Sequence, residues 1–256
     1  MRLFLHELRA QQRLFWRQRE AAFFTFFLPV IFFLIFGSVY GDRLIEEEAL
    51  QQKVKGSSFL QAGMIGYGVA ATCFAGLAIS LVVRRESGVL KRVRSTPLPP
   101  ATYIVSLLAS TFIVFLIEAA VIVLLGRTLF GVPVPDELLS LFVILLIGAA
   151  SFAAMGLGMT ALVRSAEGSS AVINAVYLPM AILSGTFFST AAYPPFLHAI
   201  AIVLPLTHFT EVTRDVMVRN EHVWNDLGSL SVVLAWGAIG LVGALRGFRW
   251  QPRESL

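Results

Sequence analysis

The chain has 256 residues, of which 57% are hydrophobic and only 14% are charged. This composition is too apolar for an ordinary soluble domain and predicts an integral membrane protein whose main partner is the lipid bilayer. A formal net charge of +4 is compatible with nucleic-acid binding, but the basic residues lie between hydrophobic segments, so we exclude a nucleic-acid-binding domain.

The first 20 residues predict an amphipathic helix along the inner membrane surface. Basic and polar side chains recur at steps of three and four and therefore share one helical face, at Arg2, His6, Arg9, Arg13, Arg17 and Glu20. Leu5, Leu8, Phe15 and Trp16 fall on the other side, and Gln12 is the one misfit. The alternative of a cleavable signal peptide is disfavoured because the run FGSVY at residues 36–40 lacks the small residues of a cleavage site.

Six apolar windows are long enough to cross a hydrocarbon core of about 30 Å, which takes about 20 residues. They are residues 21–40, 59–83, 103–125, 138–163, 170–188 and 227–245. A seventh apolar run, 196–206, is too short to span and has prolines at both ends, so we expect a re-entrant hairpin on the outer side within residues 189–226. The fold class is therefore an all-α membrane protein with six transmembrane helices in a single domain, residues 1–256.

The distribution of charge orients these helices. With six spans both termini lie on one side, and the segments on that side hold 14 of the 20 basic residues, including Arg164, Arg246, Arg249 and Arg253 near the carboxyl end. Since short loops rich in Lys and Arg stay in the cytoplasm, both termini are predicted to be cytoplasmic. The opposite loops are acidic where they are charged, at Asp42, Glu46, Glu47, Glu48, Asp136, Glu137, Glu211, Asp215, Glu221 and Asp226.

Residues 84–100 carry the densest run of charge between two apolar segments. Five of them are basic: Arg84, Arg85, Lys91, Arg92 and Arg94. The stretch 84–94 contains no proline and predicts a short helix, which the prolines at 97, 99 and 100 must end. A short helix in a cytoplasmic loop is typical of a docking element, and the alternative is a basic loop that only enforces topology.

Two regions resemble ABC-2 type exporter permeases. The first is RESGVLKR (85–92) followed by STPL (95–98), and the second is LSGTFF (183–188), YPP (193–195) and LPLTH (204–208). The resemblance implies that the first region is a coupling helix seated in a groove of a separate ATPase subunit, and that the second builds a hairpin dipping into the outer leaflet. It also implies a complex of two membrane subunits and two ATPase subunits in a bacterial-type cytoplasmic (inner) membrane.

The same resemblance assigns roles along the loop. Charged contacts with the ATPase are implied for Arg84, Arg85 and Glu86, close backbone approach for Gly88, and filling of an apolar groove for Leu90 and Val93, with Lys91 and Arg92 in the same site. The amino-terminal helix is implied to touch the ATPase as well, and a lipid anchor without a protein partner is the alternative. No G-x-x-x-x-G-K-[ST] motif occurs. ATP and Mg²⁺ are therefore expected on the partner chain, and no cofactor in this one.

Three polar residues inside the spans are candidates for the transport pathway. Glu118 is the only acidic residue well inside a span, and a carboxylate at that depth has to be protonated, paired or facing water. It is either a proton, cation or cargo site or the partner of a hydroxyl on a neighbouring helix. Asn174 and Tyr177 are candidates for the same pathway or for hydrogen bonds between helices.

These observations predict the permease subunit of an ATP-driven exporter that is not an enzyme on its own. Its cargo is a drug, lipid or glycan, and no residue chooses among them, nor between a second copy of this permease and a sister permease. One rival is a membrane-embedded lipid-modifying enzyme using Glu118, His208 and Glu211, and another is a passive channel or scaffold. His208, Glu211 and His222 are too scattered to predict a metal site.

Overall fold

A computed structural model describes residues 2–47, 52–163, 165–248 and 250–251 of the protein. Four charged residues used in the topology argument, Glu48, Arg164, Arg249 and Arg253, lie outside the described residues.

Six helices in the described ranges are long and apolar enough to cross a membrane, which confirms the predicted fold class. They are α2 (Arg19–Tyr40), the continuous helix made of α3 (Gly56–Gly68), η1 (Val69–Gly76) and α4 (Leu77–Glu86), then α6 (Pro100–Phe130), α7 (Leu138–Met159), α8 (Ala166–Leu183) and α11 (Leu227–Gly247). The protein is a multi-pass membrane protein.

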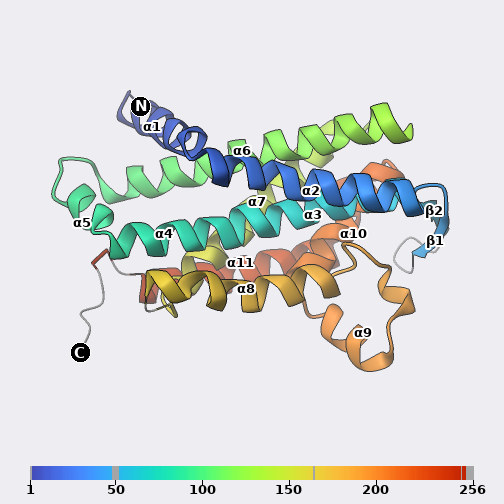
Figure 1. The fold of residues 1–256 in the computed structure, drawn as a ribbon. Coiled ribbons are helices and arrows are strands. Elements are labelled where there is room, and N and C mark those ends of the chain that lie inside the picture. Colours follow the sequence, from blue (N-terminus) through green and yellow to red (C-terminus); the bar gives the residue numbers. More distant parts are fainter. Residues whose placement is uncertain (1, 48–51, 164, 249, 252–256) are drawn as a thin grey trace.

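The six spans run side by side as one bundle (Figure 1). One end carries α1 (Arg2–Arg17), α5 (Val89–Arg94) and the last residues of α11, and the other end carries a small β-hairpin and α9 (Pro195–Ala201) (Figure 1). The amino-terminal helix and the end of the last span thus lie at the same end of the bundle as the basic loop, as an even number of spans requires.

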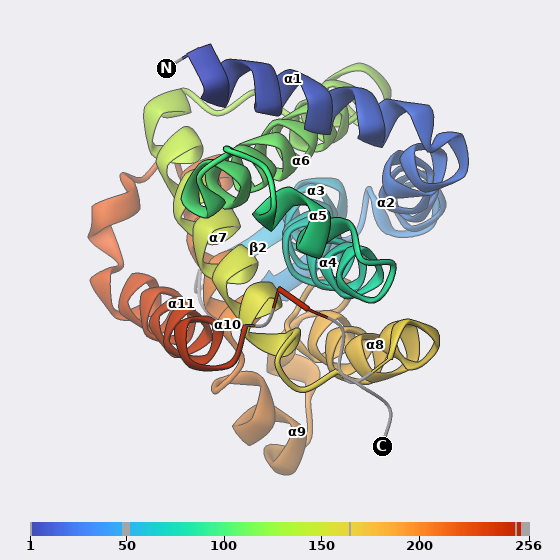
Figure 2. The ribbon, with the colours of Figure 1, turned by 90° about the vertical axis from the view of Figure 1, so that its left-hand side faces the viewer.

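The second span lies at the centre of the bundle. Seen from the end that carries α5, it is surrounded by α2, α6, α7 and α8 (Figure 2). Glycines let its neighbours approach: a Cβ on Gly66 would strike the Thr210 side chain, and one on Gly156 of α7 would lie 2.7 Å from the Phe74 carbonyl oxygen. Its middle, η1, is a π-helix, which the hydrophobic pattern did not predict.

A two-stranded antiparallel hairpin, β1 (Leu44–Glu47) with β2 (Gln52–Lys55), precedes the second span. Ile45 faces Val54 across the hairpin, and Val54 is buried. Each strand has four residues, too few for an alternating pattern to stand out in the sequence. The hairpin was not predicted.

The amino-terminal helix packs on the bundle through contacts that the sequence did not predict. Gln11 is buried, and the Gln12 amide donates a hydrogen bond to the Ser110 carbonyl oxygen at 2.9 Å, so α1 is fastened to α6 by its supposed misfit. Leu5 and Trp16, predicted to lie on the membrane-facing side of this helix, are exposed. The bond gives the partly buried Gln12 amide a hydrogen-bond partner on a neighbouring helix.

The outer re-entrant region has a longer second arm than predicted. After η2 (Thr190–Ala192) and α9, the chain bends by 80° into α10 (Pro205–Val218), and η3 (Val223–Asn225) leads to α11. Residues 207, 210, 213 and 214 of α10 are buried although they are polar or charged. The arm beyond the apolar run therefore packs within the bundle on several sides, through apolar residues such as Phe209 and Val212 as well as through these polar ones.

The spans α7 and α11 approach closely, since a Cβ on Gly240 would lie 2.5 Å from the Met155 Cα. We expect Gly240→Ala to lower the melting temperature of the purified protein, because overpacking a close contact typically costs about 1–3 kcal/mol. Gly243→Ala is the matched control: its Cβ would meet only the Gly158 Cα, at an ordinary 3.7 Å. Equal melting temperatures for the two variants would contradict the packing.

Candidate functional site: a basic helix, its anchors and a buried carboxyl

The basic loop contains a shorter helix than the sequence predicted. The second span continues through Glu86, the chain turns at Ser87 and Gly88, and α5 covers only Val89–Arg94. Gly88 has φ of +74°, a left-handed conformation that glycine adopts without the steric cost of a Cβ. The predicted single helix over 84–94 is therefore wrong, because the glycine divides it into the end of a span and a separate helical turn.

The apolar residues of α5 hold it to its own chain. Leu90 is completely buried in the core of the bundle, and Val93 packs partly against that core. Lys91, Arg92 and Arg94 are exposed. The helix thus presents a basic surface at the end of the bundle (Figure 2) and is anchored from beneath. Leu90, which was expected to fill a groove of a partner, has an internal position instead.

Arg85 is buried, with 2% of its surface exposed. Its Nη1 donates to the Thr160 carbonyl oxygen at 2.9 Å, its Nη2 to that of Val163 at 2.8 Å, and its Nε to Glu86 Oε1 at 2.8 Å. Helix carboxyl ends leave carbonyls unpaired and favour a positive charge, so Arg85 closes the end of α7. The sequence showed five basic residues in one loop but not which of them pointed inward.

Arg84 joins three elements at the same end. Its Nη1 donates to Gln11 Oε1 at 2.7 Å and to the Tyr103 hydroxyl at 3.0 Å. The second span is thereby tied to α1 and to the start of α6. Arg84 and Arg85, both expected to face a partner, have their hydrogen-bond partners within this chain. Of the five basic residues in the loop, the three on α5 are the exposed ones.

Glu118 lies on the buried face of α6, with 2% of its surface exposed. The Thr72 hydroxyl donates to its Oε2 at 2.9 Å, which is the pairing with a neighbouring helix that the sequence offered as one alternative. Gly68 makes room for the carboxyl, since a Cβ there would lie 2.7 Å from Oε1. Oε1 has no hydrogen-bond partner among the described residues.

The other two intramembrane candidates lie in α8. Tyr177 is buried, with its ring 5.8 Å from that of Tyr67, the residue before Gly68. Asn174 Nδ2 donates to Ser170 Oγ at 3.1 Å, one turn back in the same helix. The structure therefore brings Tyr177 to the stretch of the second span that adjoins Glu118, whereas the hydrogen bond of Asn174 stays within α8.

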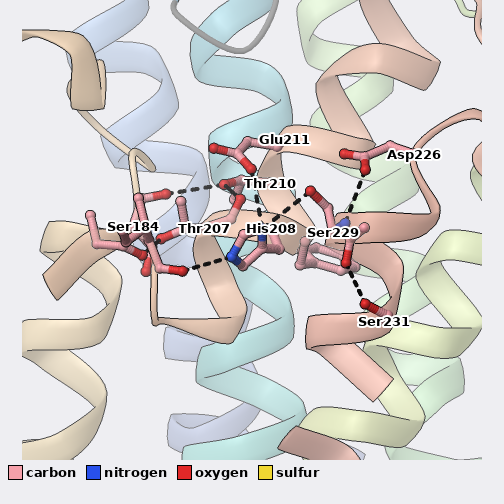
Figure 3. Close-up of polar contacts among 12 residues, drawn as sticks. Ser184, Thr207, His208, Thr210, Glu211, Asp226, Ser229 and Ser231 are labelled. Carbon is pink, nitrogen blue, oxygen red and sulfur yellow. Dashed lines mark hydrogen bonds and ion pairs between the residues drawn. The ribbon is translucent and has the colours of Figure 1, made fainter. Parts of the chain in front are cut away.

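The outer candidates fasten the re-entrant hairpin to the last span (Figure 3). The His208 ring bonds the Ile202 carbonyl oxygen at 2.8 Å and Ser229 Oγ at 3.1 Å, and Glu211 Oε2 lies 3.4 Å from its Nδ1. Asp226 caps α11 by accepting from the Ser229 amide at 2.9 Å. In the part of the chain that the structure describes, no three His, Cys, Asp or Glu side chains are grouped to hold a metal ion.

A family model described as ABC-2 type transporter matches residues 2–218 of this chain. YvfS of Bacillus subtilis (strain 168), named as a transport permease, is 22% identical over 82% of this chain and 84% of its own length. YbhR of Escherichia coli (strain K12), named as a multidrug ABC transporter permease, is 22% identical over 62% of this chain. LnrN of Bacillus subtilis (strain 168), a linearmycin resistance permease protein, is 25% identical over 68% of it. The chain spans less than half the length of the last two, 44% and 45%.

Replacing Arg85 with Gln is expected to destabilise the end of the bundle that carries α5, because the carbonyls of Thr160 and Val163 lose their charged donor. A buried polar group left unpaired costs about 1–3 kcal/mol. The measurement is the melting temperature together with protease cleavage between α7 and α8. Arg246→Gln, at an exposed position in the last turn of α11, is the matched control. Similar cleavage of both variants would contradict the role of Arg85.

His208 is expected to make the stability of the re-entrant hairpin, formed by α9 and α10, depend on pH. The hydrogen bond with Glu211 raises the pKa of His208 above its ordinary value, against the opposing effect of burial. A raised pKa in the folded state means that the protonated ring stabilises the fold at low pH, and that this contribution is lost as pH rises through the folded pKa.

The melting temperature measured from about pH 5.5 to about pH 8.5 should therefore fall more steeply for the wild type than for His208→Gln, which does not titrate there. His6→Gln, on the exposed side of α1, should keep the wild-type slope. An unchanged slope in His208→Gln would show that the ring does not stabilise the hairpin through its charge.

Proposed function

Since this chain belongs to the ABC-2 type transporter family, we propose that it is the membrane-spanning permease of an ATP-driven exporter. The ATP and Mg²⁺ are bound by a separate ATPase subunit. The complex lies in a bacterial-type cytoplasmic membrane with both termini of this chain in the cytoplasm, and it moves a drug, lipid or glycan-type substrate outward. The permease works as a pair, with a second copy of itself or with a sister permease.

The observation that carries the proposal is that α5 combines exposed basic side chains with a buried apolar anchor. A coupling element has to be exposed enough to meet a partner and held firmly enough to transmit its movement. Lys91, Arg92 and Arg94 are exposed, while Leu90 is completely buried. Three exposed cations on so short a helix favour a partner surface that carries carboxylates.

The contacts behind α5 supply a route for its movement. Gly88 joins α5 to the second span, and the two residues before Glu86 bind other elements: Arg85 holds the end of α7, and Arg84 holds α1 and α6. Closure of the ATPase pair would displace α5 and, through these bonds, shift the bundle between inward and outward accessibility.

The rival reading as a lipid-modifying enzyme gains nothing from the geometry. Glu118 bonds Thr72 on the second span, whereas His208 and Glu211 bond each other and the start of α11. No hydrogen bond or ion pair joins the two sets among the described residues, and the relatives are named as permeases.

The test is charge reversal on the exposed face of α5. Lys91→Glu combined with Arg92→Glu should reduce copurification with the ATPase that accompanies the wild-type chain by at least about tenfold, since repulsion replaces attraction at about 1.4 kcal/mol per factor of ten. ATP-driven export should fall in parallel, while the melting temperature of the permease stays the same.

Arg246→Glu is the matched control because it reverses an exposed charge in the last turn of α11, at the same end of the bundle. It should leave both assembly and export intact. Wild-type assembly by the double variant of α5 would remove the coupling assignment.

A further inference from the structure

A crevice of about 310 Å³ lies beneath α1, between α2, the second span and α6. Its lining mixes apolar side chains with hydroxyl, amide and guanidinium groups. Gln11 and Arg84 line it at the end of the bundle that carries α5, and Thr72 lines it farther along the second span. Twelve helical residues separate Arg84 from Thr72, so the crevice reaches about 18 Å into the bundle.

The inner part of the crevice adjoins the buried carboxyl. Thr72 lines the crevice and is also the residue whose hydroxyl bonds Glu118 Oε2. Val114, one turn before Glu118 in α6, lines it as well. Thr72 therefore connects the lining of the crevice to Oε2 of the carboxyl, and a ligand in the crevice would reach the carboxyl by displacing the Thr72 hydroxyl.

The carboxyl lacks a partner for one of its oxygens. Glu118 is 2% exposed, and its Oε1 has no hydrogen-bond partner in the described ranges. A buried carboxylate with an unpaired oxygen is costly in an apolar interior, so the site favours a ligand that brings a positive charge or a donor. Arg84 does not fill this role, because its Nη1 is bonded to Gln11 and Tyr103.

We propose that this crevice binds an amphipathic organic cation, whose charged group pairs with Glu118 and whose apolar body lies against Phe15, Leu77, Leu107 and Val114. These four side chains line the crevice and supply the apolar contact. A small inorganic cation is disfavoured because it needs six or more oxygen ligands, whereas one carboxyl and one hydroxyl meet here.

The volume agrees with this class of ligand. Sites for drug-sized molecules run from about 300 to about 1,000 Å³, and the crevice falls at the small end of that range. The direction of movement of such a cation, from the α5 end outward, rests on the proposed export function. Its binding does not, because the crevice and the carboxyl belong to this chain alone.

The experiment measures equilibrium binding to the full-length protein in phosphatidylcholine nanodiscs with three probes of similar shape. They are the cation phenyltrimethylammonium, its uncharged carbon isostere tert-butylbenzene, and the anion benzenesulfonate. We expect the cation to bind at least about tenfold more tightly than the other two, the factor that about 1.4 kcal/mol of charge pairing gives. Binding to empty nanodiscs is subtracted for each probe, and equal remaining affinities of all three would overturn the proposal, since they would show that the positive charge contributes nothing.

Two variants and a control locate the site. Glu118→Gln should bring the affinity for the cation down to that for its uncharged isostere, and Thr111→Phe should weaken the binding of the cation by filling the crevice while leaving the carboxyl in place. Glu167→Gln, at an exposed acid in the first turn of α8, should bind as the wild type does. Wild-type affinity in a folded Glu118→Gln variant would overturn the site. Should Glu118→Gln fail to fold, Thr111→Phe decides the question.

Failure of the two proposals can be told apart. Export is assayed in vesicles that contain the permease with its ATPase. If the cation binds as expected but ATP drives no efflux, the export function is wrong and the binding site stands. If ATP drives efflux of another cargo while Glu118→Gln binds the cation as tightly as the wild type does, the binding site alone is wrong.

Discussion

The position of the second span is the constraint on which the rest of the structure depends, and a buried guanidinium fixes it at each end. At one end Arg85 closes the carboxyl end of α7. At the other, Arg214 of α10 lies over the Phe59 ring, with its Cζ 3.9 Å from the ring centroid, and donates to the Gly185 carbonyl oxygen. A guanidinium is costly to take out of water unless its donors are satisfied, so these contacts specify where the neighbouring elements end.

Three sites that are far apart in the sequence therefore all contact the second span. The basic helix α5 continues from the second span through Gly88, the π-helical middle of the span supplies the Thr72 hydroxyl to Glu118, and its outer part packs on α10. Packed interfaces tend to switch between discrete arrangements rather than deform continuously. A displacement of this span would therefore move α5, the buried carboxyl and the re-entrant hairpin together.

The sequence predicted the features that depend on composition over long stretches. Six apolar windows became six helices because spanning a bilayer demands about 20 apolar residues whatever packs beside them. The pairing of Glu118 with a hydroxyl was foreseen as one of two alternatives, since few other groups can satisfy a carboxyl at that depth. These predictions needed no knowledge of which helices are neighbours.

What the sequence missed depended on partners far along the chain. The inward position of Arg85 follows from carbonyls 75 and 78 residues away, and the use of Gln12 follows from a carbonyl 98 residues away. The division of the basic loop at Gly88 was a local feature, but a glycine in a polar loop is compatible with many conformations. Periodicity indicates which residues share a face, and it does not indicate what that face meets.

Arg84 connects the proposed coupling helix to the proposed binding crevice. It lies four residues before Gly88, lines the crevice, and bonds both Gln11 of α1 and Tyr103 of α6. If α5 moves relative to the bundle, we expect the hydrogen bonds of Arg84 to break before those of Arg85, because Arg85 is held by two backbone carbonyls and Glu86. The bond between Arg84 and Gln11 joins two side chains, which can part by changing rotamer. The bonds of Arg85, in contrast, go to backbone carbonyls at the end of α7. On the proposed coupling, the crevice is therefore expected to open at α1 before the bundle itself rearranges.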